Sequence, residues 1–353
     1  MKPLKSLKLS CAMMQKRICF AIIFSVLFFI PTVVPAQVVT GSFEFEGKMR
    51  DYVVFLPQNY DGVSNMPLVL NLHGNYPGFD GKWQMEWTLM NTVADTAGFI
   101  VVYPTGIFQD GTNGCWYFGV TDPTNGVGFI TALLDTLNIL YRINNDQIYA
   151  CGHSGGGAMS SKLACELNHR IAAIANEGGG ITSGIAEKVN IKRPMPFLSI
   201  HGTADRNNPY NTGVPNYNLL SAEEVVSFWI DHNVCSNPDT SEIPDINPSD
   251  GCTVEKITYT NTGANTKVVF YKVINGGHTW PGSAYDIPSV GNTNRDISAS
   301  EEIWNFFKHY ELSKLSFPQH DMTVRTFPTY VNTVPILVNN FKPGVIVKNG
   351  GLK

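Results

Sequence analysis

The sequence of 353 residues is poor in charge: only 15% of its residues are Asp, Glu, Lys or Arg, whereas 43% are hydrophobic. This balance excludes a disordered chain and suits a globular, exported protein with a large core. No Cys-x-x-Cys pair and no cluster of His and Cys is present, so no zinc pattern can be found. The chain also has no internal repeat. Its length allows one large α/β domain or two small ones.

Acidic residues are absent from the first 36 positions. The basic residues there are Lys2, Lys5, Lys8, Lys16 and Arg17. Without this segment, 20 basic and 29 acidic residues remain, a formal net charge of -9. Because nucleic-acid binding needs a basic face, we expect no nucleic-acid partner.

The N-terminal segment also lacks an apolar run long enough to span a bilayer comfortably. Lys16-Arg17 precedes an apolar run from Ile18 to Ile30, and Val34-Pro35-Ala36 supplies small residues where a signal peptidase cuts. This pattern predicts a signal peptide over residues 1–36, cleaved before Gln37. An uncleaved membrane anchor is the alternative, which the short run disfavours. We therefore expect a secreted or periplasmic protein with no stable membrane anchor.

Apolar runs alternate with helix-compatible segments over residues 37–312. The main expected strands are Pro67–Leu72, Phe99–Tyr103, Ile148–Cys151, Ile171–Ala175, Met195–Ile200 and Lys267–Val273. Because these runs are continuously apolar, they predict a mostly parallel sheet with helices on both faces. The sequence therefore predicts an α/β catalytic domain over 37–312. Residues 313–353, rich in Val, Thr, Pro and Asn, form a C-terminal extension whose composition is compatible with short strands. A small β appendage, part of a sorting domain and a loosely ordered extension are the alternatives for its role.

Ser154 lies in the pattern Gly152-x-Ser154-x-Gly156, between a predicted strand and a predicted helix. This is the nucleophile-elbow pattern, in which a sharp, strained turn exposes a serine hydroxyl. The helix N-terminus behind the serine favours negative charge that develops there. A glycine-rich turn that contains a serine by chance is the alternative, but the strand and helix favour the elbow. Ser154 is therefore the predicted nucleophile.

A serine nucleophile needs a histidine base that a carboxylate orients. His278 follows the last predicted strand, whereas His73 and His201 each precede a glycine at a strand end, where an imidazole usually braces a loop. Asp205 follows a predicted strand by a short loop. The order Ser, Asp, His is that of the α/β-hydrolase fold. We therefore predict a triad of Ser154, His278 and Asp205.

Three other aspartates are alternatives for the orienting acid. Asp231 lies on a predicted helix, and Asp286 and Asp296 lie in the loop after the predicted base, out of the expected chain order. A turn-forming aspartate is the structural alternative for Asp205 itself, since Asp is common in turns.

Two backbone donors would complete the site. The tetrahedral intermediate of acyl transfer needs donors that are already in place. The N–H of Gly155 is one, and the loop after the strand Pro67–Leu72 supplies the other, most simply the N–H of Asn75. A plain tight turn is the alternative for His73-Gly74.

Six motifs occur in an order that resembles one enzyme family. They are Leu72-His73-Gly74, Gly98-Phe99-Ile100-Val101-Val102-Tyr103-Pro104, Val127-Gly128-Phe129-Ile130, Gly152-His153-Ser154-Gly155-Gly156, His201-Gly202-Thr203-Ala204-Asp205 and Gly277-His278-Thr279-Trp280-Pro281-Gly282. Together they resemble the secreted polyhydroxybutyrate-depolymerase-like esterases, which include feruloyl and acetylxylan esterases. The resemblance covers roughly residues 43–310. It implies an α/β-hydrolase esterase with a Ser-His-Asp triad and no metal or organic cofactor.

The chain departs from this family pattern at several places. Asn125-Gly126 replaces two acids at a helix start, no polymer-binding module follows the catalytic domain, and the C-terminal extension has no counterpart. The cysteine that the family usually carries near the Tyr259 strand is missing. Cys235 and Cys252 flank a polar stretch, Ser236 to Gly251, which we expect to be a loop, and export permits disulfides. We therefore expect a disulfide between Cys235 and Cys252.

Aromatic side chains near the predicted catalytic edge are candidate substrate contacts. Trp280, Trp116 and Trp83 could stack on a feruloyl ring or a sugar. Ordinary core and rim packing is the alternative for each of them.

These patterns predict a secreted serine carboxylesterase that hydrolyses ester bonds of an extracellular polymer. Feruloyl or acetyl esters of plant polysaccharide rank ahead of polyhydroxyalkanoate. A serine peptidase on the same fold is one alternative, although it usually needs an extra domain or a charged pocket. A catalytically inactive binding protein is the other, and it predicts a broken triad. The patterns leave the oligomeric state open.

Overall fold

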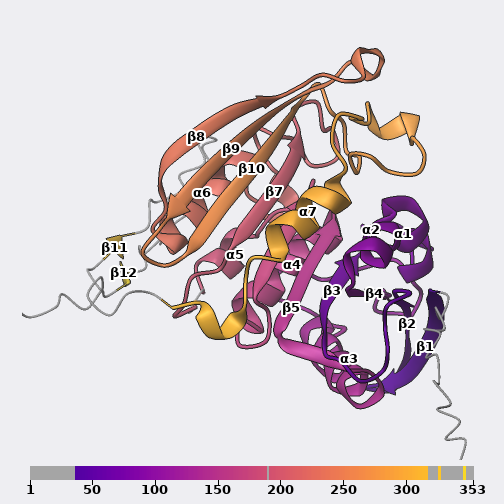
Figure 1. The fold of residues 1–353 in the computed structure, drawn as a ribbon. Coiled ribbons are helices and arrows are strands. Elements are labelled where there is room, and N and C mark those ends of the chain that lie inside the picture. Colours follow the sequence, from indigo (N-terminus) through magenta and orange to yellow (C-terminus); the bar gives the residue numbers. More distant parts are fainter. Residues whose placement is uncertain (1–35, 189–190, 317–324, 327–344, 347–353) are drawn as a thin grey trace, which may run out of the picture. The chain divides into compact units, whose positions relative to one another are not determined.

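A ten-stranded sheet organises the computed structural model, which describes residues 36–188, 191–316, 325–326 and 345–346. The strands are β1 Gln37–Phe45, β2 Lys48–Leu56, β3 Met66–Leu72, β4 Ile100–Pro104, β5 Ile143–His153, β6 Ala173–Glu177, β7 Phe197–Gly202, β8 Ser236–Ile243, β9 Thr253–Asn261 and β10 Thr266–Ile274. Their order across the sheet is β1-β2-β4-β3-β5-β6-β7-β10-β9-β8 (Figure 1). The predicted signal peptide lies outside the described residues, except for Ala36.

The middle of the sheet is parallel and its two edges are antiparallel. Strands β4, β3, β5, β6, β7 and β10 pair in parallel. Strands β1 and β2 extend one edge with antiparallel pairing, and β9 and β8 extend the other. The prediction of a mostly parallel sheet is therefore confirmed. Because parallel strands share a direction, their carboxyl ends gather at one edge, where ligands bind in such folds.

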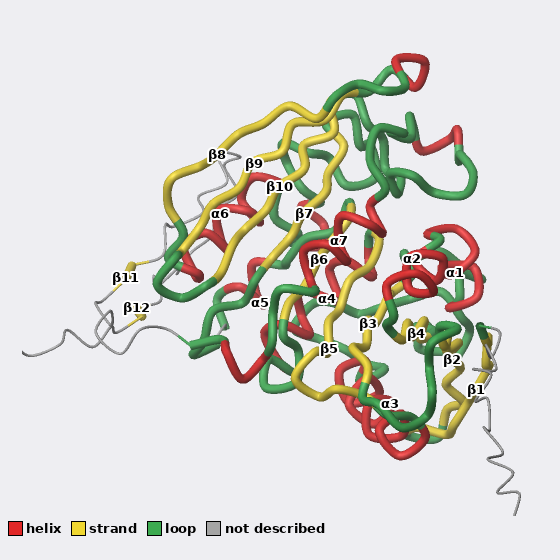
Figure 2. Tube along the Cα trace, viewed as in Figure 1, coloured by secondary structure: helices red, strands yellow, loops and turns green. Residues whose placement is uncertain are grey.

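Helices cover both faces of the sheet (Figure 2). They are α1 Gly81–Thr88, α2 Met90–Ala97, α3 Gly126–Leu140, α4 Gly155–Glu166, α5 Ser183–Ala186, α6 Ala222–Asn233 and α7 Ala299–Phe307, with short 3₁₀ turns at 215–217, 248–250, 288–290 and 312–314. One core cluster joins the sheet to α3, α4 and α6. A second joins it to α1, α2 and α7. Burial on both faces explains why the central strands are continuously apolar.

The polar stretch between Cys235 and Cys252 was expected to be a loop, and it contains strand β8. Nearly every residue of β8 is exposed, so the strand shows no hydrophobic alternation that sequence could reveal. Pro238 is tolerated there because β8 lies at the edge of the sheet and has a register shift between Ser236 and Asp239. Antiparallel pairing with β9 holds this strand in place.

The predicted disulfide between Cys235 and Cys252 is wrong, since the described residues contain no disulfide. The two cysteines lie beside opposite ends of the β8–β9 ladder, which runs from the Ser236–Thr260 pair to the Ile243–Val254 pair. Eight residues of β8 separate these ends by roughly 25 Å at about 3.3 Å per residue. A disulfide needs Cα atoms within about 7 Å.

In the C-terminal extension, β11 (Arg325–Thr326) pairs antiparallel with β12 (Val345–Ile346). The rest of residues 317–353 lies outside the described part of the chain. None of the helices in the described ranges is both long enough and apolar enough to cross a membrane.

Candidate active site

Ser154 occupies a strained turn between β5 and α4. Its backbone has φ 53° and ψ −120°, a conformation that non-glycine residues rarely adopt. The Ser154 N–H donates to the Glu177 carbonyl at the end of β6, over 2.8 Å. A side chain at Gly152 would place its Cβ 2.6 Å from the Leu72 carbonyl oxygen, so glycine is required where β5 and β3 approach α4. This geometry is that of a nucleophile elbow.

His278 and Asp205 meet at the same edge of the sheet. His278 Nδ1 lies 2.6 Å from Asp205 Oδ2, and both side chains are almost fully buried. Asp205 follows β7 and His278 follows β10, two neighbouring parallel strands, so their loops emerge side by side. The backbone N–H of His278 donates to the Val290 carbonyl over 2.8 Å, which fixes the loop that carries the imidazole.

Several partners hold the Asp205 carboxylate in its charged form. Burial alone would raise the pKa of Asp205, but the hydrogen bond and charge of His278, the His201 ring and the Asn208 N–H together lower it below its usual value. Oδ1 accepts from the N–H groups of Asn207 and Asn208 at 2.9 and 2.8 Å. A carboxylate that stays charged can stabilise an imidazolium at His278.

The alternative acids lie elsewhere in the structure. Asp286 is exposed on the surface and pairs with Arg295 at 2.5 Å. Asp296 accepts hydrogen bonds from the backbone of Ile246 and Asn247. Asp231 lies on α6, whereas Asp205 contacts the predicted base at hydrogen-bond distance.

The elbow adjoins this pair through the end of β6. Gly178 follows Glu177, whose carbonyl accepts from the Ser154 N–H. A Cβ on Gly178 would lie 3.0 Å from His278 Nδ1 and 3.4 Å from Asp205 Oδ2. The structure therefore brings all three predicted triad residues to one place. Their chemical roles remain a prediction.

The two predicted oxyanion donors lie against each other. A Cβ on Gly155 would fall 2.3 Å from Asn75 Oδ1, so the Asn75 side chain covers Gly155. Two hydrogen bonds of 2.9 Å anchor the Asn75 side chain to the backbone N–H and carbonyl of Trp116. A Cβ on Gly74 would lie 3.3 Å from Ser154 Cβ, which places this loop beside the nucleophile.

His73 and His201 brace loops, as their positions before glycine predicted. The Gly106 N–H donates to His73 Nε2 over 2.8 Å, so His73 Nδ1–H donates to the Gly74 carbonyl, also over 2.8 Å. This arrangement ties the Gly74 loop to the end of β4. His201 Nε2 contacts the Asn208 carbonyl at 2.8 Å and so supports the loop of Asp205.

Sequence reasoning missed a second buried pair at the site. His153 Nδ1 is hydrogen-bonded to Glu177 Oε2, and the His153 ring centroid lies 4.5 Å from that of His278. Burial lowers the pKa of His153 to about 4 and raises the pKa of Glu177 well above its usual value. Both shifts favour the uncharged forms of the two side chains. The sequence feature that could have revealed this pair is Glu177, an acid just after a predicted apolar strand.

The predicted aromatic contacts are mostly packing residues. Trp280 is fully buried, and its Nε1–H donates to Ser300 Oγ over 3.2 Å, so the expectation that it contacts substrate is wrong for this structure. Trp116 is also buried, against His73. Of the three, only Trp83 is partly exposed. Its ring stacks on that of Phe79, with 3.7 Å between the two ring centroids.

Comparisons with known proteins agree on one family. A family profile described as Esterase PHB depolymerase matches residues 50–193. The putative esterase NocK of Nocardia uniformis subsp. tsuyamanensis is 30% identical over 256 residues, which are 68% of this chain and 73% of that protein. Feruloyl esterase B of Piromyces equi is 26% identical over 243 residues, 65% of this chain and 42% of that protein.

Two further proteins add to this picture. A bifunctional acetylxylan esterase/xylanase of Neocallimastix patriciarum is 32% identical over 161 residues, 45% of this chain but only 22% of that longer protein. The acetyl xylan esterase structure from Aspergillus awamori aligns with a TM-score of 0.52 at 14% identity, covering 77% of this chain and 99% of that one. The structural match supports the α/β-hydrolase fold. The chain belongs to the PHB-depolymerase-type esterases and is a carboxylic ester hydrolase.

Proposed function

We propose that this esterase is a secreted serine enzyme in which Ser154 attacks the ester, His278 is the base and Asp205 orients it. The contact of 2.6 Å between His278 Nδ1 and Asp205 Oδ2, beside the strained turn of Ser154, carries the proposal. That contact fixes the imidazole so that Nδ1 holds a proton and Nε2 accepts one. Secretion follows from the predicted signal peptide at residues 1–36.

Acylation begins when Ser154 Oγ attacks the ester carbonyl carbon and His278 Nε2 takes the hydroxyl proton. The resulting imidazolium is stabilised by the charged Asp205 carboxylate. The former carbonyl oxygen becomes an oxyanion, which accepts from the N–H groups of Gly155 and Asn75. As the intermediate collapses, the bond to the leaving alcohol breaks and His278 Nε2–H protonates it. The acyl group stays on Ser154 Oγ.

Deacylation repeats these steps with water. His278 Nε2 takes a proton from water as the hydroxide oxygen bonds to the acyl carbon. The second oxyanion again accepts from Gly155 and Asn75. Collapse breaks the bond to Ser154 Oγ, which takes the proton back, and the carboxylic acid leaves. The two hydrogen bonds that tie the Asn75 side chain to Trp116 keep this donor loop in place through both steps.

We assign the substrate to feruloyl or acetyl esters of plant polysaccharide. Relatives that align with this chain are named as feruloyl esterases and as an acetylxylan esterase. The ring of Trp83 stacks with Phe79 and Trp87 and is partly exposed. Its exposed part offers an aromatic surface on which a feruloyl ring or a sugar can stack.

A substrate panel tests the assignment. Hydrolysis rates are measured for methyl ferulate, acetylated xylan, a polyhydroxybutyrate film and a peptide substrate with the same purified protein, with Ser154→Ala as the blank for each. Cleavage of methyl ferulate or acetylated xylan at least about tenfold faster in kcat/KM than the other two supports it. Faster cleavage of the polyester or of the peptide would replace the polysaccharide assignment.

A further inference from the structure

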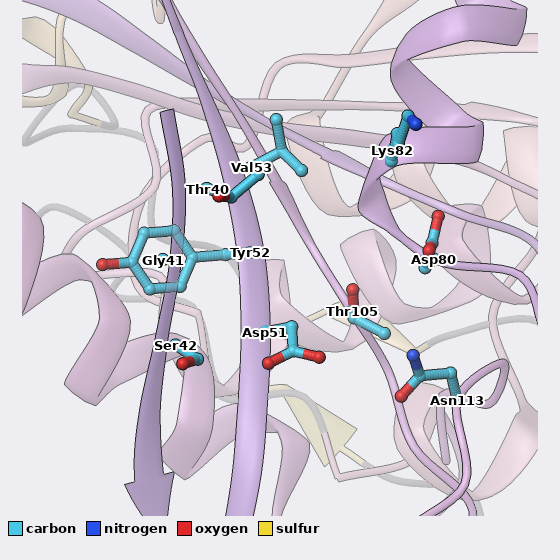
Figure 3. A pocket seen from close by; sticks show the side chains of 10 residues that line it. All are labelled: Thr40, Gly41, Ser42, Asp51, Tyr52, Val53, Asp80, Lys82, Thr105 and Asn113. Carbon is cyan, nitrogen blue, oxygen red and sulfur yellow. The ribbon is translucent and has the colours of Figure 1, made fainter. Parts of the chain in front are cut away.

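A cavity of about 390 Å³ opens beside strands β1 and β2. Its walls combine Asp51 of β2, Asp80 before α1, and Thr105 and Asn113 from the segment after β4 (Figure 3). In the figure the Asp51 carboxylate extends from β2 toward Thr105 and Asn113. The volume falls within the range of ligand sites, roughly 300–1,000 Å³. No residue of the proposed catalytic machinery lines this cavity.

The cavity lies at the same edge of the sheet as the nucleophile. Gly152, two residues before Ser154, pairs with Leu72 at the carboxyl end of β3. Pro104, at the carboxyl end of β4, pairs with Tyr52 of β2. Three strand spacings, from β5 through β3 and β4 to β2, amount to roughly 14 Å. A short chain of sugars whose ester is at Ser154 could therefore reach the cavity.

The cavity walls carry hydrogen-bonding groups that the protein itself does not use. Within the described part of the chain, the side chains of Asp51 and Asn113 take part in no hydrogen bond or ion pair. Asp80 uses Oδ1 to cap α1 and accepts there from the Trp83 N–H at 2.8 Å, which leaves Oδ2 open. Thr105 Oγ1 accepts from the Gly81 N–H at 3.1 Å, so its own proton can be donated to a ligand.

These groups match the hydroxyls of a sugar better than an ion. Two carboxylates disfavour an anion, and Lys82, the cation in the lining, pairs with Glu86 at 3.8 Å. A cation would need more ligands, and no group of three or more His, Cys, Asp or Glu in the described residues could hold a metal. Carboxylate and amide oxygens accept from sugar hydroxyls, while the amide NH₂ of Asn113 and the hydroxyl of Thr105 donate to them. Hydrogen bonds to a charged carboxylate are the stronger kind.

We propose that this cavity is a carbohydrate subsite, in which Asp51, Asn113 and their neighbours bind the polysaccharide chain at a distance from the ester that Ser154 attacks. The inference rests on the proposed function, because it assumes a polysaccharide ester as substrate. It adds a binding site on β1 and β2 for the sugar chain. The subsite gives longer glycans a lower KM without touching the reacting atoms.

The test compares a double variant, Asp51→Ala with Asn113→Ala, with the wild type. The quantity measured is the ratio of kcat/KM on acetylated xylohexaose to kcat/KM on p-nitrophenyl acetate, which carries no sugar. Loss of hydrogen bonds to a charged group predicts that this ratio falls about tenfold, mainly through KM. Glu166→Ala, which removes an exposed carboxylate at the end of α4, is the matched control and should leave the ratio unchanged.

A binding measurement separates this proposal from the proposed function. Unesterified xylohexaose is titrated into Ser154→Ala and into Ser154→Ala that also carries the double change, by calorimetry. Binding that the double change weakens about tenfold supports the subsite. Absence of binding, or equal binding by both proteins, overturns the subsite even where wild-type ester hydrolysis depends on Ser154. If the double change weakens binding but wild-type hydrolysis does not depend on Ser154, the proposed function is overturned and the subsite stands.

Discussion

Glu177 and His153 form a buried, hydrogen-bonded pair whose imidazole lies against the ring of the proposed base. The His153 and His278 ring centroids are 4.5 Å apart, and the His153 ring also meets Trp87 edge-on, with centroids 4.9 Å apart. His153 is thus held between a tryptophan, a carboxyl group and the base. Burial disfavours the charged forms of His153 and Glu177, whereas the lowered pKa of Asp205 favours a charged carboxylate in contact with His278.

The raised pKa of Glu177 predicts a pH-dependent stability that Glu177→Gln removes. Burial raises the pKa of Glu177 above its unfolded value, so the folded protein keeps a proton that the unfolded chain releases above about pH 4.5. The free energy of unfolding therefore falls as pH rises from there. Gln keeps a donor for His153 Nδ1 and cannot ionise. We expect the difference in the free energy of unfolding between Glu177→Gln and wild type, measured in urea, to favour the variant more at about pH 8 than at about pH 5. Parallel pH profiles for the two proteins would contradict a protonated Glu177.

His73 predicts the opposite sign at acid pH. Burial lowers the pKa of His73 from 6.5 to about 4, so below about pH 6.5 the unfolded chain binds a proton that the folded protein excludes. The resulting loss of stability grows as pH falls from about 6.5 to about 4, where it levels off at roughly 3 kcal/mol. Protonation would also remove the acceptor of the Gly106 N–H.

The variant His73→Phe isolates this contribution. It loses both loop hydrogen bonds, which costs about 1–3 kcal/mol near pH 7, but its free energy of unfolding should fall less steeply between about pH 6.5 and 4. Urea unfolding at several pH values measures both effects. His153 and His201 keep their own acid dependence in the variant, because their pKa values are also lowered. An unchanged slope would show that His73 is not neutral in the fold.

Asp205→Asn tests the orienting acid. The amide keeps the shape of the side chain but can hold the His278 imidazole in the wrong tautomer, so kcat on p-nitrophenyl acetate should fall about 10⁴-fold. Asp286→Asn is the control, because Asp286 pairs with Arg295 on the surface and should lose less than about twofold. Comparable losses in the two variants would remove Asp205 from its proposed role.

Trp280→Phe separates packing from substrate contact. The smaller ring leaves a gap in the core and drops the hydrogen bond to Ser300, which should lower the free energy of unfolding by about 1–3 kcal/mol. KM for methyl ferulate should stay at its wild-type value, since the ring has no exposed surface. A rise in KM with unchanged stability would restore Trp280 as a substrate contact. Thermal melts and initial rates on one preparation supply both readouts.

The three residues of the proposed triad could be found in the sequence because each of them follows a strand of the parallel sheet. Ser154, Asp205 and His278 come after β5, β7 and β10, and parallel strands bring such ends to one edge. Chain order and residue type were then enough to select them. The bracing roles of His73 and His201 followed from the same reasoning.

Other features depend on packing that sequence periodicity does not encode. The depth of Trp280 in the core and the contact of His153 with Glu177 are tertiary facts, since a loop residue next to the base can point into the core as easily as into the site. Strand β8 was missed because an exposed edge strand has no apolar pattern. The error over Cys235 and Cys252 followed from that, since a strand keeps apart two residues that a loop could bring together.

The most direct test of the account is whether Ser154 carries the acyl group. Wild type and Ser154→Ala are mixed with p-nitrophenyl acetate, quenched rapidly, digested and analysed by mass spectrometry. We predict an acetyl group on the peptide with Ser154 in the wild type, none in Ser154→Ala, and a loss of about 10⁶-fold in the variant's kcat. Undiminished hydrolysis by Ser154→Ala, with no acetyl group on the wild-type peptide, would contradict it.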